Sequence, residues 1–367
     1  MNSFEKYDKM LSCTPYDDRR DIPVFPMMVA SYGKFGGVLQ KDLIASADNW
    51  LQAVEKTFER FGVPDVSMPM CAGDTAFVMG LPSRLPGKEL GDDDLYQFVE
   101  TPYFDDVAEY DRILQMGYEA WNMEHSMKIH GFNSPQEMGA RFGQLGQNLG
   151  KTMGYFYSKG VVPCFDASGG CLFDNLSLTR SMAAFTYDLF DVPEKIHDII
   201  NTFQPTMTEN SVKQAKAQGA KRVSIWAMRS SATFVSPAIW EEFVWPSMKD
   251  LMIKYHEAGI TSVLHADGNW SPMIPYFLEL PKGCLQIELD GDTDIFKAYE
   301  ILQGYQSMRG DVPATMLAYG SYDDVREYCE KLVQMGMKGG FMLSSGCEVP
   351  LNAKPENVQA MMDAVRK

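Results

Sequence analysis

Basic residues are scarce in this chain of 367 residues: 33 Lys and Arg stand against 49 Asp and Glu, and the formal net charge is −16. Nucleic acid or an anionic membrane would need a basic face, so this balance argues against both as partners. Long hydrophobic runs are also missing, because no segment approaches the roughly 18 apolar residues of a membrane span. Residues 1–8 are polar and lack the apolar core of a signal peptide. We therefore expect a cytoplasmic protein.

Cysteine is also sparse. The seven cysteines are an odd number without regular spacing, which does not make a disulfide framework. Hydrophobic residues form 45% of the chain, so a large core can form and disorder is not expected. The 25 methionines are read first as adaptable core residues, although those at strand ends could line a soft apolar pocket.

Short apolar runs alternate with helical patterns along most of the chain. Eight strand candidates lie near residues 24, 65, 161, 222, 261, 284, 305 and 340. Strands that alternate with helices indicate parallel β units, and eight of them predict an α/β fold, a closed (β/α)8 TIM barrel. Residues 1–20 form an N-terminal arm. Residues 71–160 show no clear strand pattern and are interpreted as a mainly helical insertion between strands 2 and 3, within a single domain spanning residues 1–367.

Helix boundaries follow from capping residues. Asp191 is predicted as an N-cap with Glu194 facing it in a capping box. The same pattern predicts that Pro205 breaks or kinks this helix. Ser321 is predicted to begin an amphipathic helix near the end of the chain.

Potential metal ligands follow three of the late strands. His265 and Asp267 end one apolar run, Glu288 lies in the next, and Cys347 follows the last. In a TIM barrel the strand ends converge at the C-terminal mouth, where active sites are built. Zinc accepts nitrogen, oxygen and sulfur ligands, and a catalytic zinc keeps one position open. Taken singly, each residue is more often structural: a polar histidine, a buried thiol or a capping carboxylate.

The chain also resembles a known family. The segments Leu264-His-Ala-Asp-Gly-Asn269, Gly320-Ser-Tyr-Asp-Asp-Val-Arg326 and Gly339-Gly-Phe-Met-Leu-Ser-Ser-Gly-Cys-Glu-Val-Pro350 are similar to those of the uroporphyrinogen decarboxylase superfamily. This resemblance implies a (β/α)8 barrel with one of two main chemistries. True decarboxylases carry an N-terminal Met-Arg-Gln-Ala-Gly-Arg-like segment for their acidic substrate. The matching stretch here, Met27-Met-Val-Ala-Ser-Tyr-Gly-Lys34, lacks both arginines, so decarboxylation of uroporphyrinogen is not expected.

The second branch comprises zinc-dependent methyltransferases that exchange methyl groups with a corrinoid protein. Their usual ligands are His-x-Cys and a late Cys, whereas this chain has His265, Asp267 and Cys347 at these positions. Related members with His-x-Asp-Gly carry a Glu on the following strand, and Glu288 looks like its counterpart. The resemblance therefore implies zinc ligands His265, Glu288 and Cys347, with Asp267 as a catalytic residue beside them. The exchange of Asp267 and Glu288 between these roles stays open.

The resemblance implies a function. Zn2+ would activate the heteroatom of a small methyl donor, most suitably an aromatic methyl ether in an O-demethylation. The methyl group would pass to the cob(I)alamin of a separate corrinoid protein, since this chain has no Asp-x-His-x-x-Gly corrinoid-binding segment. Met70, Trp226, Met228 and Met342 are predicted to line an apolar pocket for a flat ring.

Three alternatives stay open at this point. One is a decarboxylase-like lyase without a metal, and another is a methyltransferase that works in reverse, from a methylated corrinoid to a thiol. The third is a non-catalytic subunit that binds a ligand or a corrinoid protein. The sequence is compatible with a homodimer but does not fix the oligomeric state.

Overall fold

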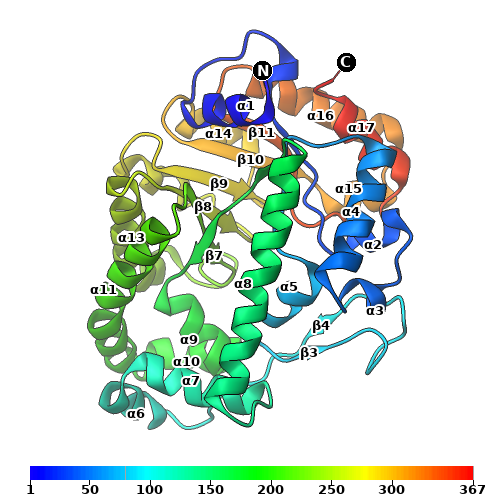
Figure 1. Ribbon diagram of the computed structural model, residues 1–367. Coiled ribbons are helices and arrows are strands. Elements are labelled where there is room, and N and C mark those ends of the chain that lie inside the picture. The colour runs from blue at the N-terminus through cyan, green and yellow to red at the C-terminus, as the bar shows by residue number, and fades with distance from the viewer. Residues whose placement is uncertain (79, 367) are drawn as a thin grey trace.

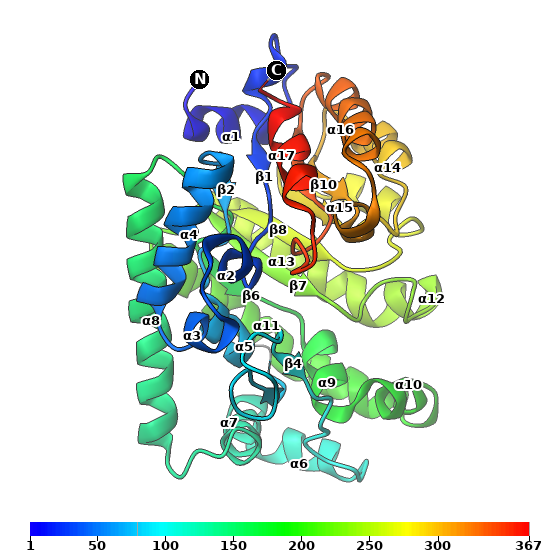
Figure 2. The same cartoon turned by 90° about the vertical axis from the view of Figure 1, so that its right-hand side faces the viewer.

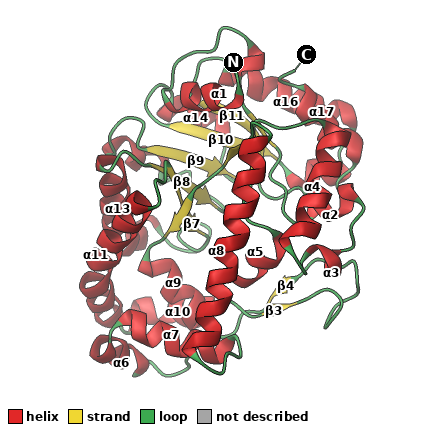
Figure 3. Cartoon of the chain, viewed as in Figure 1, coloured by secondary structure: helices red, strands yellow, loops and turns green. Residues whose placement is uncertain are grey.

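The structure is a computed structural model that describes residues 1–78 and 80–366. A barrel of parallel strands lies at its centre and helices surround it (Figures 1 and 3). The barrel strands, in chain order, are β1 (Val24–Phe25), β2 (Val66–Ser67), β5 (Val162–Pro163), β6 (Ala167–Gly169), β7 (Arg222–Ala227), β8 (Thr261–Ala266), β9 (Leu285–Leu289), β10 (Ser307–Val312) and β11 (Phe341–Ser345). All eight predicted strand positions are occupied, so the predicted (β/α)8 barrel is confirmed.

The strands close into a ring through their hydrogen bonds. Seven of them form one parallel sheet in the order β1-β11-β10-β9-β8-β7-β6, and β2 pairs with β5. The third barrel strand is split into two parts, since β5 pairs with β2 while β6 pairs with β7. The ring closes where the backbone N–H of Asp65 donates to the carbonyl of Val24, 3.1 Å away.

Helices connect consecutive strands on the outside of the barrel. They are α2 (Ser31–Gly36), α3 (Gln40–Leu43), α4 (Ala47–Phe61), α9 (Leu172–Arg180), α10 (Met182–Asp191), α11 (Pro193–Ala217), α12 (Pro237–Ile239), a π-helical turn η2 (Trp240–Val244), α13 (Trp245–Glu257), η3 (Ile274–Glu279), α14 (Ile295–Leu302), α15 (Ala314–Tyr319), α16 (Tyr322–Gly336) and α17 (Pro355–Asp363). Helix α16 begins as predicted, because Ser321 and Asp324 form a reciprocal capping box.

The predicted start of α11 at an Asp191 N-cap is wrong. Val192, without a side-chain capping bond, precedes α11, while Asp191 is the last residue of α10. Pro205 lies inside α11 and does not end it, so the predicted break is absent, while the alternative of a kink stays a prediction. Proline has no N–H, so Pro205 leaves the carbonyl of Asn201 without an intrahelical donor. Both residues are exposed, and water can therefore donate a hydrogen bond to the Asn201 carbonyl.

The insertion between β2 and the third barrel strand is mainly helical, as predicted. It contains α5 (Ala72–Val78), a hairpin of β3 (Ser83–Arg84) and β4 (Gln97–Phe98), and then α6 (Glu109–Met116), α7 (Tyr118–Ile129) and the long α8 (Pro135–Ser158). Figures 1 and 2 show α6 and α7 at the end of the molecule opposite the two termini, with α8 running along one side. That the chain forms a single domain stays a prediction.

The N-terminal arm covers the other end of the barrel. It consists of α1 (Ser3–Leu11) and the turn η1 (Arg19–Asp21). The Tyr7 hydroxyl donates a hydrogen bond to the buried Gln286 side chain of β9, and the Arg222 guanidinium lies 5.0 Å from the Tyr7 ring centre. The chain's start therefore closes the bottom of the barrel and leaves the C-terminal mouth as the open end. No helix in the described part of the chain is long and apolar enough to cross a membrane.

Candidate metal centre

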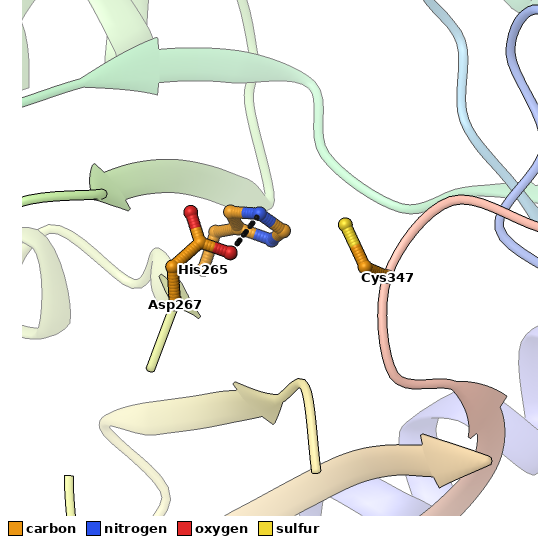
Figure 4. Close-up of side chains that lie close together, drawn as sticks. All are labelled: His265, Asp267 and Cys347. Carbon is orange, nitrogen blue, oxygen red and sulfur yellow. Dashed lines mark ion pairs between the residues drawn. The ribbon is translucent and has the colours of Figure 1, made fainter. Parts of the chain in front are cut away.

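Three side chains with metal-binding atoms meet at the mouth of the barrel. His265 lies near the end of β8, Asp267 follows that strand, and Cys347 follows β11. One ligand atom from each residue lies within 4.8 Å of the others. Figure 4 shows Asp267 and Cys347 on opposite sides of the His265 ring. His265 is buried, whereas the other two are half-buried, so the group opens towards the mouth.

The imidazole of His265 is held between two carboxylates. Its Nε2 lies 3.2 Å from Oδ1 of Asp267, and its Nδ1 lies 3.0 Å from Oε2 of Glu288. Burial disfavours the charged ring, but the two carboxylates outweigh this effect and raise the pKa of His265 well above its usual value. One ring nitrogen thus faces the open side of the site, and the other faces the barrel interior.

Glu288 lies behind His265 and outside the three-residue group. Strand pairing places His265, Glu288 and Arg309 side by side on β8, β9 and β10. Arg309 forms an ion pair with Glu288, and their side chains are only 3% and 2% exposed. Although burial opposes ionisation, Arg309 and His265 hold the pKa of Glu288 at about 2. Glu288 is therefore a buried carboxylate that contacts His265 from the side away from Asp267.

The sequence did not single out Arg309 as part of the site. Its guanidinium is buried and lies 4.5 Å from the ring centre of Phe25. A charged residue within the strand Ser307-Met-Arg-Gly-Asp-Val312, all of which is buried, was the signal that could have revealed it. Buried arginines are rare unless they are paired, so this position implied an acidic partner on a neighbouring strand.

A cavity of about 880 Å³ adjoins the metal-binding group. Of the predicted pocket residues, Met70, Trp226 and Met228 line it. The Trp226 ring lies 5.0 Å from the His265 ring and so links the cavity to the site. Met342 is completely buried within the core instead, and it is not among the described residues that line the cavity. The prediction for Met342 is corrected accordingly.

Nine of the lining residues are aromatic, and seven of these come from the insertion. The aromatic lining residues are Phe77, Tyr96, Phe98, Tyr103, Tyr118, Phe132, Phe142, Phe165 and Trp226. Aromatic faces bind flat rings through dispersion and edge-to-face contacts. Sequence reasoning predicted only Trp226 among them. It missed the seven from the insertion because no local pattern reveals which side chains of residues 71–160 face the barrel mouth.

The charged groups of the wall are acidic. Glu119, Asp166, Asp174 and Glu348 line the cavity, and no Lys or Arg does so among its described lining residues. Asp166 is neutralised by Arg222, 2.9 Å away. Glu348 accepts backbone hydrogen bonds from Val29, Ala30 and Ser31 at the start of α2.

Asp174 is the most deeply buried of these carboxylates, with 3% of its surface exposed. It belongs to α9 and accepts hydrogen bonds from the backbone N–H of Arg229, at 2.9 Å, and from the hydroxyl of Ser230. Burial raises its pKa to about 6 despite these bonds. Sequence reasoning missed it, although an acidic residue within Leu172-Phe-Asp-Asn-Leu176 was a usable signal.

Comparison with known proteins gives a family and a fold. Residues 173–367, more than half of the chain, match the uroporphyrinogen decarboxylase (URO-D) family. No match is found among curated proteins. Among solved structures, a methyltransferase from Methanosarcina mazei is similar, with a TM-score of 0.66 and 14% sequence identity over 100% of this chain and 98% of that one. At this identity the likeness shows a common fold. By its family match, the chain belongs to the uroporphyrinogen decarboxylase family.

Proposed function

We propose that this chain is a zinc-dependent methyltransferase. It would move a methyl group from a small donor, most suitably an aromatic methyl ether, to the cob(I)alamin of a separate corrinoid protein. The observation that carries this proposal is the meeting of His265, Asp267 and Cys347 within 4.8 Å beside a cavity whose lining includes nine aromatic residues. The fold shared with a methyltransferase supports the same reading.

The three residues suit zinc by their chemistry. Imidazole nitrogen, carboxylate oxygen and thiolate sulfur are the three kinds of ligand that zinc takes, and three protein ligands leave a fourth position for a substrate. We assign His265, Asp267 and Cys347 as the ligands, in place of the set with Glu288 expected from the sequence. Zinc bound there would supply Lewis acidity towards the heteroatom of the methyl donor.

Glu288 and Arg309 have a supporting role in this assignment. Glu288 contacts His265 Nδ1, the ring nitrogen opposite the one beside Asp267. Carboxylates in this position fix the orientation of a ligating imidazole and increase its basicity. Arg309 keeps Glu288 ionised in the barrel interior, so the pair holds the ring of His265 in one orientation.

The cavity would bind and shield the donor. Its aromatic wall would stack on a flat ring, and Trp226 would hold that ring next to His265. With a corrinoid protein docked over the mouth, the wall would also help to exclude water, which quenches reduced corrinoids. The insertion supplies seven of the nine aromatic lining residues, so it would contribute most of the stacking surface for the donor.

The competing readings fit the site less well. A decarboxylase of an acidic macrocycle needs cations to bind its carboxylates, and the described lining residues include no Lys or Arg. Transfer in the reverse direction, from a methylated corrinoid to a thiol, is associated with His-x-Cys, where this chain has Asp267. A non-catalytic binding subunit would have no need for three converging metal-binding side chains.

The test combines metal analysis with a methyl-transfer assay. Purified protein is analysed for zinc and then incubated with a reduced corrinoid protein and a panel of methyl ethers, methylamines and methyl thiols. We expect about one zinc per chain and the spectrum of methylcobalamin with an aromatic methyl ether. The His265→Ala variant should lose both zinc and activity, while His256→Ala, on α13 away from the site, should keep both. Full activity of His265→Ala, or failure of the wild-type protein to take up zinc, would refute the proposal.

A further inference from the structure

The cavity wall is negatively charged although several arginines lie nearby. Three of them are sequence neighbours of lining residues, yet each forms an ion pair with a carboxylate and none lines the cavity. These pairs are Arg141 with Asp74 at 2.8 Å, Arg180 with Asp188 at 2.7 Å and Arg229 with Glu100 at 3.1 Å. The cations of this region are therefore already neutralised and leave no partner for an anionic ligand.

Asp174 is the buried carboxylate among the described lining residues, and the Arg229 guanidinium near it pairs with Glu100 instead. No Lys or Arg in the described part of the chain forms an ion pair with its side chain, and its two hydrogen bonds come from neutral groups, the Arg229 backbone and Ser230. An ionised carboxylate can accept about four hydrogen bonds, so acceptor positions stay available on a side chain that lines the cavity. A ligand with a donor group or a positive charge would satisfy them.

We propose that Asp174 is a specificity-determining residue that makes this cavity select methyl donors by charge. This inference rests on the proposed function. It predicts that a cationic aromatic methyl ether binds most tightly, an uncharged one less tightly, and one that carries a carboxylate most weakly. The aromatic wall acts in the same direction, because ring faces attract cations and repel anions.

The size of the effect follows from Coulomb's law. A ligand carboxylate at about 6 Å from Asp174, with an effective dielectric constant of about 20 to 40, would bind roughly 10- to 100-fold more weakly than an uncharged group. An ammonium group at the same distance would gain a similar factor. Ligands that share the same methoxyphenol ring would coordinate the metal in the same way. Their affinities can therefore be compared for the effect of the charged substituent alone.

Three ligands that differ only in one substituent provide the test. They are 2-methoxy-4-methylphenol, 4-hydroxy-3-methoxybenzylamine and 4-hydroxy-3-methoxybenzoate, which are uncharged, cationic and anionic at about pH 8. Their binding to the purified protein is measured by titration calorimetry without a corrinoid protein. In the wild-type protein the amine should bind most tightly, and the benzoate should bind at least about 10-fold more weakly than the uncharged phenol.

The Asp174→Asn variant keeps the shape of the side chain and an acceptor for the Arg229 N–H. It should lower the ratio of amine affinity to benzoate affinity by at least about 10-fold, and the aromatic wall and Glu348 account for any preference that remains. Its affinity for the uncharged phenol should stay near that of the wild type, which also reports that the cavity is folded. Asp198→Asn, which removes an exposed charge on α11 outside the cavity, should retain the wild-type ratio.

Equal binding of the benzoate and the uncharged phenol, an amine-to-benzoate affinity ratio that Asp174→Asn leaves unchanged, or no binding of any of the three would overturn the inference. Its failure is distinguishable from failure of the proposed function. Binding in the expected order without methyl transfer would refute the methyltransferase proposal alone. Methyl transfer that is most efficient with the benzoate would refute the charge selection alone.

Discussion

Replacing Glu288 by Gln removes one negative charge from the buried row of His265, Glu288 and Arg309 and keeps the size of the side chain. The Arg309 side chain is 3% exposed, so the substitution leaves its guanidinium buried without a counter-charge. Loss of one partner of a buried ion pair typically lowers the free energy of unfolding by about 3–5 kcal/mol. We expect a loss of this size for the metal-free protein.

The same variant tests which carboxylate binds zinc. If Glu288 only orients His265, its replacement should weaken zinc binding by about 10- to 100-fold. Asp267→Asn removes a direct ligand in our assignment, and it should weaken zinc binding by more than about 100-fold. The two carboxylates should therefore differ clearly in their effect on the zinc affinity.

Two measurements on the same proteins check these values. Urea denaturation followed by circular dichroism gives the free energy of unfolding, and competition with a chromophoric chelator gives the zinc affinity. The double variant Glu288→Gln, Arg309→Met removes both buried charges, so it should regain most of the lost stability but keep the weaker zinc binding. If the double variant binds zinc more weakly than Asp267→Asn, Glu288 is a ligand and our assignment is wrong.

Two further predictions concern the surroundings of the site. A Cβ on Gly346, which precedes Cys347, would lie 2.6 Å from the carbonyl oxygen of Asp290. Gly346→Ala should therefore displace the Cys347 loop and weaken zinc binding at least about 10-fold in the chelator assay. Gly150 in α8 has open space around it, so Gly150→Ala should leave the zinc affinity unchanged. Burial raises the pKa of Asp311 from 3.8 to about 6. Because the folded state holds this proton more tightly than the unfolded state, the stability of the wild-type protein falls between about pH 4 and 6 and stays lower above pH 6. Asp311→Asn should therefore gain up to about 3 kcal/mol relative to wild type between pH 4 and 6 in urea denaturation and keep that gain at higher pH, and a difference that does not change with pH would contradict this reasoning.

The barrel could be predicted from the sequence because its strands are buried on both faces and appear as short apolar runs. Predictions of helix ends from single capping or proline residues were less reliable, because the outcome also depends on solvent exposure and on where the neighbouring helix ends. Asp191 satisfies the pattern of an N-cap, but α10 extends as far as this residue, and the pattern does not show where a preceding helix ends. Pro205 is tolerated within α11 because it faces water, which its residue type does not reveal.

The sequence predicted which side chains meet at the candidate metal centre, but not which of the carboxylates faces its open side. His265, Asp267 and Cys347 could be expected together, because strand ends of a barrel converge at one mouth. The position of Glu288 could not be read from the sequence, since it depends on the register that places Arg309 beside it on β10. Asp174 and the aromatic wall come from segments whose placement over the barrel depends on tertiary packing alone.

The division of the third barrel strand into β5 and β6 has a consequence for engineering. Residues 165–170, at this division and directly after it, all line the cavity, whereas the metal-binding group belongs to β8 and the loop after β11. The part of the wall that would recognise the donor and the part that would hold the catalytic ion thus belong to separate stretches of chain. A library of variants confined to residues 165–170 could change which compounds are accepted without altering the proposed zinc ligands, and duplication of the gene would let evolution make the same change.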